Sequence, residues 1–305
     1  MNRRNFIQNT AFGTAGAVLF SPQLFARLLN KDPFDMRELR GGVGIFTERG
    51  GTIAYLQTKD GISVVDTQFP EQSNHLIEAL KKSLEKPPSS EKPFKHVINT
   101  HHHGDHSSGN IAFKDLAEHF VAHENSKKNQ VTTAEKSNSV DENVFPDVVF
   151  NDSWKGKSGQ ETIKMHYFGA GHTDGDSFVH FQKANIVHTG DMLFNRRHPY
   201  IDRSAGASVV SWIDVLETAT RTFDSDTLYV FGHSGEGFDV TGEKADLMAF
   251  REYLQQAHDF VAKQKAAGKS ATEITEIKEF DFKSEWHGDG IKRVLNALVD
   301  ELGVE

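Results

Sequence analysis

The pattern of apolar residues begins with short β-type runs that are interrupted by glycine turns. Between Val43 and Phe69, the sequence VGIFTERGGTIAYLQTKDGISVVDT places two such turns, at 49–51 and 59–61, between runs rich in β-branched and aromatic residues. This arrangement predicts a hairpin or a meander of antiparallel strands. Over 71–85, apolar residues then recur every three to four positions, which predicts an amphipathic helix.

Predicted strands and helices alternate along the rest of the chain. The run HVINT is predicted to be a strand that leads directly into a cluster of histidines, and a helix is expected after it over 108–119. A polar stretch of low hydrophobicity covers about 125–145. Beyond it we expect strands at 148–150, 162–168, 177–181, 185–189 and 227–231, and helices at 208–223, 242–267 and 290–302. No linker divides this order, which predicts a single α/β domain over 27–305 with two sheets and outer helices.

Residues 1–26 have the pattern of an export signal. Paired arginines, Arg3 and Arg4, precede Phe6 and Ile7, and the mildly apolar run TAFGTAGAVLF follows. The run is shorter than the about 20 apolar residues of a membrane span, so it suits a removable signal and predicts no stable span after cleavage. The pattern resembles a twin-arginine signal, which implies the twin-arginine export machinery as a partner and a periplasmic or secreted protein. A disordered basic start before an amphipathic helix remains the alternative.

Composition narrows the chemistry more than the architecture. Among 305 residues, 34 are Lys or Arg and 43 are Asp or Glu, which gives a formal net charge of −9. The sequence has no basic tract or basic-aromatic stripe, so nucleic acid is not expected as a partner. Cysteine is absent. This excludes disulfides and every thiolate metal site, so any zinc would be held by histidine and carboxylate side chains.

The segment INTHHHGDH, residues 98–106, is a candidate metal-binding segment. His101 and His103 are two positions apart, and such residues point to the same side of an extended chain, so they can reach one ion together. His102 alternates to the opposite face and is not expected to bind. The glycine that follows lets the chain turn, which would direct the next aspartate and histidine toward a second ion beside the first.

Three further candidate ligands follow predicted strands. His172 lies in FGAGHTDGD, Asp191 in IVHTGDMLF, and His233 in LYVFGHSGEG. In each segment an apolar run is followed by glycine and then by a ligand-type side chain, so rigid strands would present the three groups at a shared edge. Together with the histidine cluster, these residues would complete two adjacent metal sites.

Taken in order, these motifs resemble the metallo-β-lactamase superfamily, and the bridging aspartate described below is the pattern of its glyoxalase II-like members. The resemblance runs from the strands after Val43 to His233. It implies an αββα sandwich, in which two mixed β-sheets are flanked by helices and the metals lie at one edge of the sheets. It implies that the first metal is bound by His101, His103 and His172. It implies that the second is bound by Asp105, His106 and His233, and that Asp191 bridges the two. The resemblance also implies that Asp66 supports the metal-binding loop by hydrogen bonding.

The same resemblance implies the chemistry. The site would hold two zinc ions, with iron or manganese as the alternatives. Zinc lowers the pKa of a bound water from about 15.7 toward about 7, which provides hydroxide at neutral pH. Asp105 and Asp191 are the expected catalytic residues, because Asp105 would orient the bridging hydroxide and Asp191 would bind both ions. The predicted function is hydrolysis of an ester, thioester or lactone-type bond in a small-molecule substrate.

Two other functions stay open on the sequence. A β-lactamase is favoured by the overall motif and by the export signal. An iron-dependent persulfide oxygenase or a non-enzymatic metal-binding protein would bind metal only at the site of His101, His103 and His172.

The segment FNRRHPYID, residues 194–202, is expected to lie near the substrate because it comes just after Asp191. A loop that simply packs against the protein is the alternative for this segment. The candidates for substrate contact are Asn195, Arg196, His198 and Tyr200.

Overall fold

The computed structural model describes residues 32–83, 92–282 and 284–305. Phe34–Glu305 form one compact unit. The proposed signal, residues 1–26, lies outside the described residues. Within the described part, no helix has both the length and the apolar character needed to cross a membrane.

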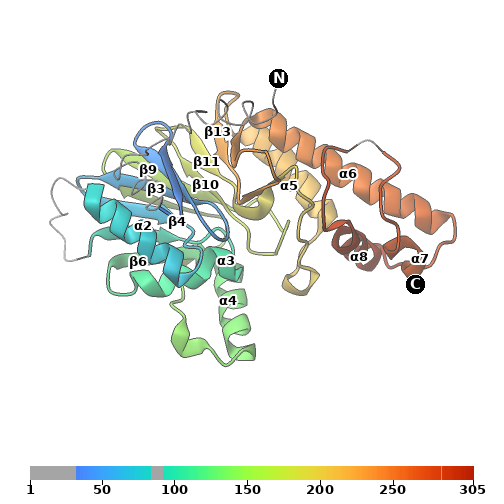
Figure 1. Ribbon diagram of the computed structural model, residues 1–305, viewed down its shortest axis with the longest axis horizontal. Coiled ribbons are helices and arrows are strands. Elements are labelled where there is room, and N and C mark those ends of the chain that lie inside the picture. The colour runs from blue at the N-terminus through green and yellow to red at the C-terminus, as the bar shows by residue number, and fades with distance from the viewer. Residues whose placement is uncertain (1–31, 84–91, 283) are drawn as a thin grey trace, which may run out of the picture. The chain divides into compact units, whose positions relative to one another are not determined.

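The first sheet has seven strands in the order of the chain (Figure 1). The strands up to β4 pair in antiparallel fashion, and the connections from β4 to β7 are parallel. The predicted meander after Val43 corresponds to the second, third and fourth strands. The strands are β1 (Asp35–Glu38), β2 (Val43–Thr47), β3 (Ile53–Thr58), β4 (Gly61–Val65), β5 (Phe94–Ile98), β6 (Ala117–His123) and β7 (Val148–Phe150).

The second sheet has six strands in the order β15-β13-β11-β10-β9-β8. All pairs are antiparallel except β11 with β13. Its strands are β8 (Ser153–Ser158), β9 (Glu161–His166), β10 (Phe178–Phe181), β11 (Ile186–His188), β13 (Leu228–Val230) and β15 (Thr241–Gly242). A separate parallel pair joins β12 (Phe194–Asn195) to β14 (His233–Ser234).

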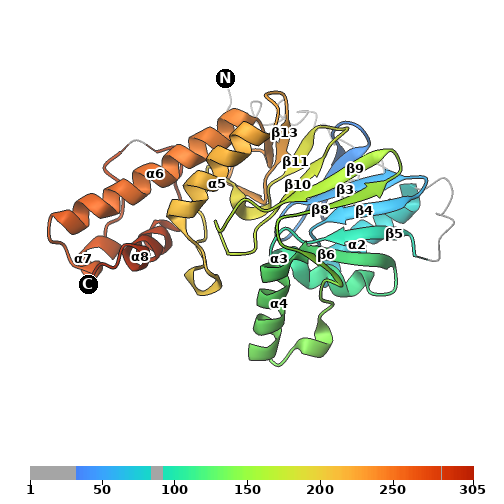
Figure 2. The same ribbon diagram turned by 180° about the vertical axis from the view of Figure 1, so that it is seen from behind.

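Helices cover the outer faces of both sheets (Figures 1 and 2). In the views from both sides, α2 lies against the first sheet, and α5 and α6 lie beside the second. The helices are α2 (Pro70–Ser83), α3 (Gly104–Ser107), α4 (Glu124–Lys136), α5 (Val209–Thr222), α6 (Lys244–Ala266), α7 (Ala271–Thr275) and α8 (Ile291–Glu301).

Neighbouring residues on the buried strands point into different parts of the core. In β4, Val64 packs with α2, whereas Val65 packs between the sheets. In β11, Ile186 packs between the sheets and Val187 packs against α5 and α6. This follows from the twofold alternation of side chains along a strand when both faces of the sheet are covered. The order helix, sheet, sheet, helix confirms the predicted αββα sandwich.

The segment after the histidine cluster differs from the prediction. The predicted helix over 108–119 is wrong: a 3-10 turn at Ser108–Phe113 is followed by strand β6, which is part of the first sheet. The polar stretch from about 125 contains helix α4, in which only Ser126, Gln130 and Ala134 are buried. Because only three positions are buried and two of them are polar, apolar residues do not recur at helical spacing in this part of the sequence. The strands β1 and β8 and the short helix α7 were also not predicted.

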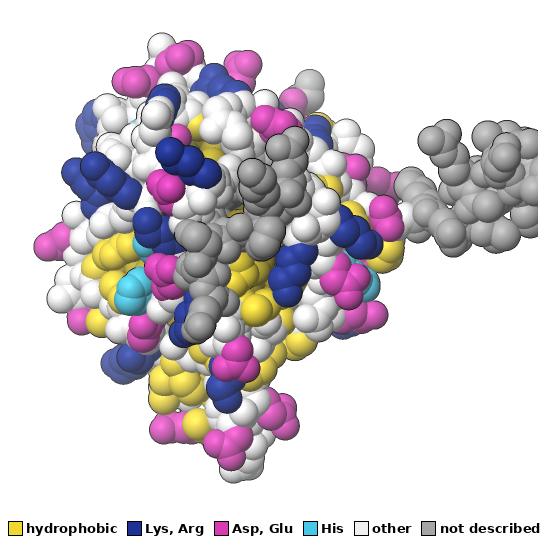
Figure 3. All heavy atoms as spheres, turned by 90° about the vertical axis from the view of Figure 1, so that its left-hand side faces the viewer, with side chains coloured by type: hydrophobic (Ala, Val, Ile, Leu, Met, Phe, Trp, Pro, Cys, Tyr) yellow, Lys and Arg dark blue, Asp and Glu magenta, His cyan; other side chains and the backbone are white. Residues whose placement is uncertain are grey.

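Charge is mixed on the face of the molecule shown in Figure 3, which is the left-hand side of Figure 1. Acidic and basic side chains lie side by side there, and no continuous surface of one sign is present on this face. Such a surface favours solubility and gives no long-range field of one sign on that side.

Candidate metal centre

All seven side chains that the sequence predicts as metal ligands meet where strands of both sheets end. The histidine cluster follows β5, His172 lies in the loop after β9, Asp191 follows β11, and His233 begins β14. Ligand atoms in each of two groups lie within 4.8 Å of one another. The first donor group is His101, His103, His172 and Asp191, and the second donor group is Asp105, His106 and His233.

In the first donor group, three ring nitrogens and a carboxylate oxygen converge. His103 Nδ1 lies 3.1 Å from His101 Nε2 and 2.8 Å from His172 Nε2. Asp191 Oδ2 lies 3.9 Å from His101 Nε2 and 3.5 Å from His172 Nε2. Imidazole nitrogens and carboxylate oxygens are the donors that zinc, iron and manganese sites use.

Hydrogen bonds on the outer side of the rings orient two of these histidines. His172 Nδ1 donates to the backbone carbonyl of Tyr200 at 2.6 Å. His103 Nε2 donates to Asp202 Oδ2 at 3.0 Å. With the outer nitrogen protonated in each ring, the inner nitrogen carries the lone pair. Such partners are typical of metal-binding histidines, because they fix the tautomer and the ring orientation.

Asp66 connects the two donor groups. Its Oδ2 faces His106 Nδ1 at 2.7 Å and accepts from the Thr100 hydroxyl at 2.8 Å. The oxygen of that hydroxyl lies 3.0 Å from His101 Nδ1, so it accepts from the outer nitrogen of a ring in the first donor group. Asp66 is fully buried and has a φ of 65°, a left-handed conformation that aspartate tolerates better than most residues. Asp66 therefore contacts residues of the metal-binding loop through both Thr100 and His106.

The second donor group is more open. His233 Nε2 lies 3.1 Å from Asp105 Oδ2 and 3.4 Å from His106 Nε2. The side chain of Asp105 is 32% exposed and that of His233 13%, whereas that of His106 is fully buried. No hydrogen-bond partner for His233 Nδ1 is found among the described residues.

Asp191 lies between the two donor groups. Its Oδ1 is 3.1 Å from His106 Nε2, and its Oδ2 is 3.5 Å from both His172 Nε2 and His233 Nε2. The residue before His233 is a glycine because a Cβ at Gly232 would collide with the Asp191 carboxylate. The placement suits a carboxylate that bridges two ions.

Two imidazoles of the first donor group, those of His101 and His172, are held neutral. Burial lowers the pKa of His172 to about 3 and lowers that of His101 well below its ordinary value. A neutral imidazole is the form that binds a metal ion.

The carboxylates and His106 show that this site favours positive charge. Burial raises the pKa of Asp105, but the hydrogen bond from His233 and the charge of His106 outweigh it and lower the pKa to about 2. Burial lowers the pKa of His106, but the charges of Asp191 and Asp66 outweigh it and raise the pKa well above its ordinary value. With its carboxylates ionised and the lone pairs of His101, His103 and His172 aimed inward, the first donor group with Asp191 fits a metal ion, and the negative charge of Asp105 and Asp191 favours a second one.

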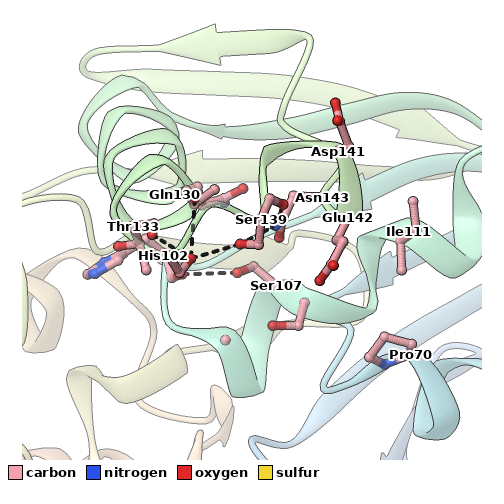
Figure 4. Close-up of a pocket in the computed structure, with 14 residues that line it drawn as sticks. Pro70, His102, Ser107, Ile111, Gln130, Thr133, Ser139, Asp141, Glu142 and Asn143 are labelled. Atoms are coloured by element: carbon pink, nitrogen blue, oxygen red, sulfur yellow. Dashed lines mark hydrogen bonds between the residues drawn. The ribbon is translucent and has the colours of Figure 1, made fainter.

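His102 lies outside the two donor groups and lines a cavity of about 570 Å³ between the metal-binding loop and α4 (Figure 4). Gln130 and Thr133 of α4 line the same cavity. The Nδ1 of His102 is buried and has no partner among the described residues. Its Nε2 is 3.8 Å from Asp202 Oδ2, within a third cluster of ligand-type atoms that includes His103. That distance exceeds a hydrogen bond, and the Asp202 carboxylate already accepts from His103.

Two of the four residues predicted to contact substrate are held within the protein. Asn195 is buried, and its Nδ2 donates to the backbone carbonyl of Asp239 at 2.8 Å. Arg196 donates to Asp246 at 2.7 Å and to Glu285 at 3.0 Å. These contacts hold the 194–202 segment in place.

The other two differ in exposure. His198 is buried, and its Nδ1 lies 2.7 Å from the Tyr253 hydroxyl. Tyr200 is 42% exposed, and its ring lies 5.4 Å from the ring of His103 and 6.0 Å from that of His172. Of the four, Tyr200 therefore lies where a substrate can reach it.

Sequence reasoning missed Asp202 and Thr100 as partners of the metal-binding histidines. Asp202 ends the segment FNRRHPYID, but nothing in that segment distinguishes a carboxylate that reaches His103 from one that faces solvent. Thr100 immediately precedes the cluster and was included in the predicted strand. Both assignments depend on three-dimensional contacts between distant segments.

Comparison with a protein-family model shows a match over residues 46–233 to the family described as the metallo-beta-lactamase superfamily. The match begins within β2 and ends at His233. It includes all seven predicted ligands and leaves the helices α6, α7 and α8 outside.

Comparison with solved structures shows the same fold. A metallo-beta-lactamase from Pontibacter korlensis aligns with a TM-score of 0.60 at 21% identity, over 73% of this chain and 99% of that chain. A metallo-beta-lactamase from Hirschia baltica aligns with a TM-score of 0.58 at 18% identity, over 73% and 98%. A double mutant of the sec-alkyl sulfatase PisA1 aligns with a TM-score of 0.70 at 12% identity, over 88% of this chain and 50% of that one.

Proposed function

The chain belongs to the metallo-β-lactamase superfamily of metal-dependent hydrolases, and from this premise we propose that it is an exported dinuclear zinc hydrolase. Its substrate is a small molecule with an ester, thioester or lactone-type bond. The observation that carries the proposal is the pair of donor groups that share the side chain of Asp191.

The donor set supports zinc in both positions. It consists of imidazole and carboxylate groups, which zinc binds in catalytic sites, and the chain has no cysteine. When bound, paired zinc ions supply a water of lowered pKa and polarise the bond that is cleaved. Iron and manganese accept the same donors and are the alternatives to test.

The residues of the chain orient the reaction. His101, His103 and His172 would hold the first ion, and Asp191 would contribute a carboxylate to both donor groups. Asp105 has a more exposed carboxylate than Asp191: their side chains are 32% and 5% exposed. Its ionised carboxylate would accept a hydrogen bond from the attacking water and so orient it.

Alternative functions predict different metal contents. An iron-dependent persulfide oxygenase or a metal-binding protein needs only the first donor group. The convergence of Asp105, His106 and His233 supports a second ion and hence the hydrolase. A β-lactamase would use both donor groups, so substrate tests must separate it from an ester hydrolase.

The test measures metal per chain by mass spectrometry on the full-length exported protein, together with hydrolysis of a panel of substrates. We expect about two zinc ions and turnover of a carboxyl ester, thioester or lactone that is lost on chelation and restored by zinc. The panel includes a β-lactam and an alkyl sulfate. One iron per chain, or no chelator-sensitive hydrolysis across the panel, would contradict the proposal, and efficient turnover of the β-lactam alone would favour the β-lactamase.

Export through the twin-arginine pathway rests on Arg3 and Arg4 ahead of an apolar run. Replacing both (Arg3→Lys with Arg4→Lys) keeps the charge but removes the arginine pair. We expect the variant to stay in the cytoplasm, whereas Asn2→Gln is exported as the wild type is. Equal periplasmic amounts of the double variant and the wild type would rule out this route.

A further inference from the structure

An exposed aromatic ring borders the first donor group. The ring of Tyr200 lies 5.4 Å from that of His103 and 6.0 Å from that of His172. The backbone of Tyr200 is fixed, because its carbonyl accepts from His172 Nδ1 at 2.6 Å. A substrate that approaches the metal-binding atoms from this side therefore contacts the Tyr200 ring.

A cation lies over the same ring. Arg293, in the first turn of α8, has its Cζ 5.9 Å from the centroid of the Tyr200 ring. Gly290 brings α8 close to the 194–202 segment, since a Cβ at this glycine would lie 3.0 Å from Cβ of His198. Gly290 has a φ of 129°, which favours glycine. The start of α8 is thus fixed beside Tyr200.

Arg293 differs from two other arginines at this loop. Arg196 forms ion pairs with Asp246 and Glu285, and Arg203 forms them with Asp300 and Glu301. The side chain of Arg293 is exposed, and its guanidinium forms no ion pair with any residue that the structure describes. Arg196 and Arg203 are neutralised locally, whereas Arg293 keeps its charge available to a ligand.

Charged groups of both signs surround Tyr200 and Arg293. Asp202 is a negative charge on this loop, and its carboxylate is directed to His103 and to the Ser204 hydroxyl, from which it accepts hydrogen bonds. Arg197 is exposed and adds positive charge to the loop, and Asp289, in the turn before α8, is exposed and adds negative charge. In a chain of net charge −9, a local cation beside the metal centre would steer anionic substrates to it.

We infer that Arg293 and Tyr200 form a subsite for an anionic group of the substrate, a carboxylate or a similar oxyanion. The inference rests on the proposed hydrolase function and narrows its substrates to esters or thioesters that carry such a group. Arg293 lies outside residues 46–233, so the C-terminal segment contributes this specificity to the superfamily core. A guanidinium suits the role because it can donate two parallel hydrogen bonds to an oxyanion.

The kinetic test uses two esters that differ in one charge. The mono-4-nitrophenyl ester of glutaric acid keeps a free carboxylate, and its methyl ester is neutral. We expect Arg293→Ala to lower kcat/KM for the anionic ester about 10-fold or more, mainly through KM, because a hydrogen bond to a charged group contributes about 1.5–3 kcal/mol. The neutral ester changes less than about twofold, and Arg293→Lys keeps part of the selectivity.

Lys292→Ala is the matched control. Lys292 is the neighbour of Arg293 on α8, but it pairs with Glu276 instead. Its removal takes away the same charge from the same helix turn and leaves the ratio of the two esters unchanged. Equal losses on both esters in Arg293→Ala, or an equal shift of the ratio in the Lys292 variant, would overturn the subsite.

A binding measurement separates failure of the subsite from failure of the hydrolase proposal. The Nε–H signal of Arg293 is recorded by ¹H–¹⁵N NMR on zinc-loaded protein and assigned with Arg293→Lys. Monomethyl glutarate is expected to shift this signal, and dimethyl glutarate is not. If neither ester is cleaved but the selective shift occurs, the subsite stands and ester hydrolysis fails. The absence of a selective shift would overturn the subsite whatever the activity.

Discussion

The two donor groups of the metal centre are held in different ways. In the first, each of the histidines has an acceptor for its outer nitrogen: Thr100 for His101, Asp202 for His103 and the carbonyl of Tyr200 for His172. The second combines fully buried His106 with two partly exposed residues, Asp105 and His233, and His233 Nδ1 has no partner among the described residues.

This difference indicates unequal affinity for metal. A group whose side chains are already fixed loses little conformational freedom on binding, whereas a more exposed group must be ordered by the ion. We therefore expect the first ion to bind tightly and the second to exchange more readily. Asp191 contacts both groups, so the two affinities are coupled through its carboxylate.

The largest effect is expected at Asp191, where the two groups meet. Asp191→Asn keeps the shape of the side chain but removes the negative charge that both ions share. We expect less than one metal per chain and hydrolysis reduced about 10³-fold, since several kcal/mol of transition-state stabilisation depend on the ions. Asp60→Asn, in the exposed turn between β3 and β4, is the control and leaves both quantities unchanged. Full metal content in the Asp191 variant would show that the groups bind independently.

A stepwise loss of metal tests the asymmetry directly. In wild type, a chelator is expected to remove one ion quickly and the other slowly. His233→Ala removes a ligand of the second donor group, so the fast phase disappears and about one ion per chain remains. His172→Ala removes a ligand of the first donor group, so the ion that was lost slowly is lost faster. Loss of both ions at one rate in wild type would refute the unequal affinities.

Supporting carboxylates should give intermediate effects that differ between the groups. Asp202→Asn weakens only the first ion, because Asp202 contacts His103. Asp66→Asn weakens both, because Asp66 faces His106 directly and reaches the first group through Thr100. Each change is expected to lower metal affinity about 10- to 100-fold. Asparagine tolerates the positive φ of Asp66, so the backbone is kept. Competition with a fluorescent zinc chelator measures each affinity, and equal effects on both ions in both variants would remove the distinction.

The sequence was sufficient for the parts of the fold in which apolar periodicity is strong. The meander after Val43 and the helices α2, α5, α6 and α8 were predicted to within a few residues. Strand β6 was mistaken for a helix because its run AEHFVAH follows apolar residues that fit a helical period as well. Helix α4 is polar on most of its surface and is held by few buried residues, so its hydrophobic pattern is weak.

The candidate site was predicted as a set of residues but not as a supported structure. The spacing within the histidine cluster and the positions after strands identified seven side chains that the structure brings together. Their partners Thr100, Asp202 and the carbonyl of Tyr200 have no sequence signal, because each depends on loops that meet only after folding. Arg293, 60 positions after the last predicted ligand, is likewise found only from the packing of α8.

The smallest effect is expected from His102, which tests whether the first donor group excludes this neighbouring histidine. Its Nε2 lies 3.8 Å from Asp202 Oδ2, close enough to suggest a third metal cluster with His103. The hydrogen bond from His103 already occupies that carboxylate, so we expect His102 to bind no ion. His102→Gln should keep about two metals per chain and change metal affinity less than about threefold, well below the effect of losing a supporting hydrogen bond. Mass spectrometry and chelator competition measure both quantities, with Gln130→Ala, which lines the same cavity, as the control for local packing. A drop to one metal in the His102 variant alone would show that the cluster, and not the first donor group, holds an ion.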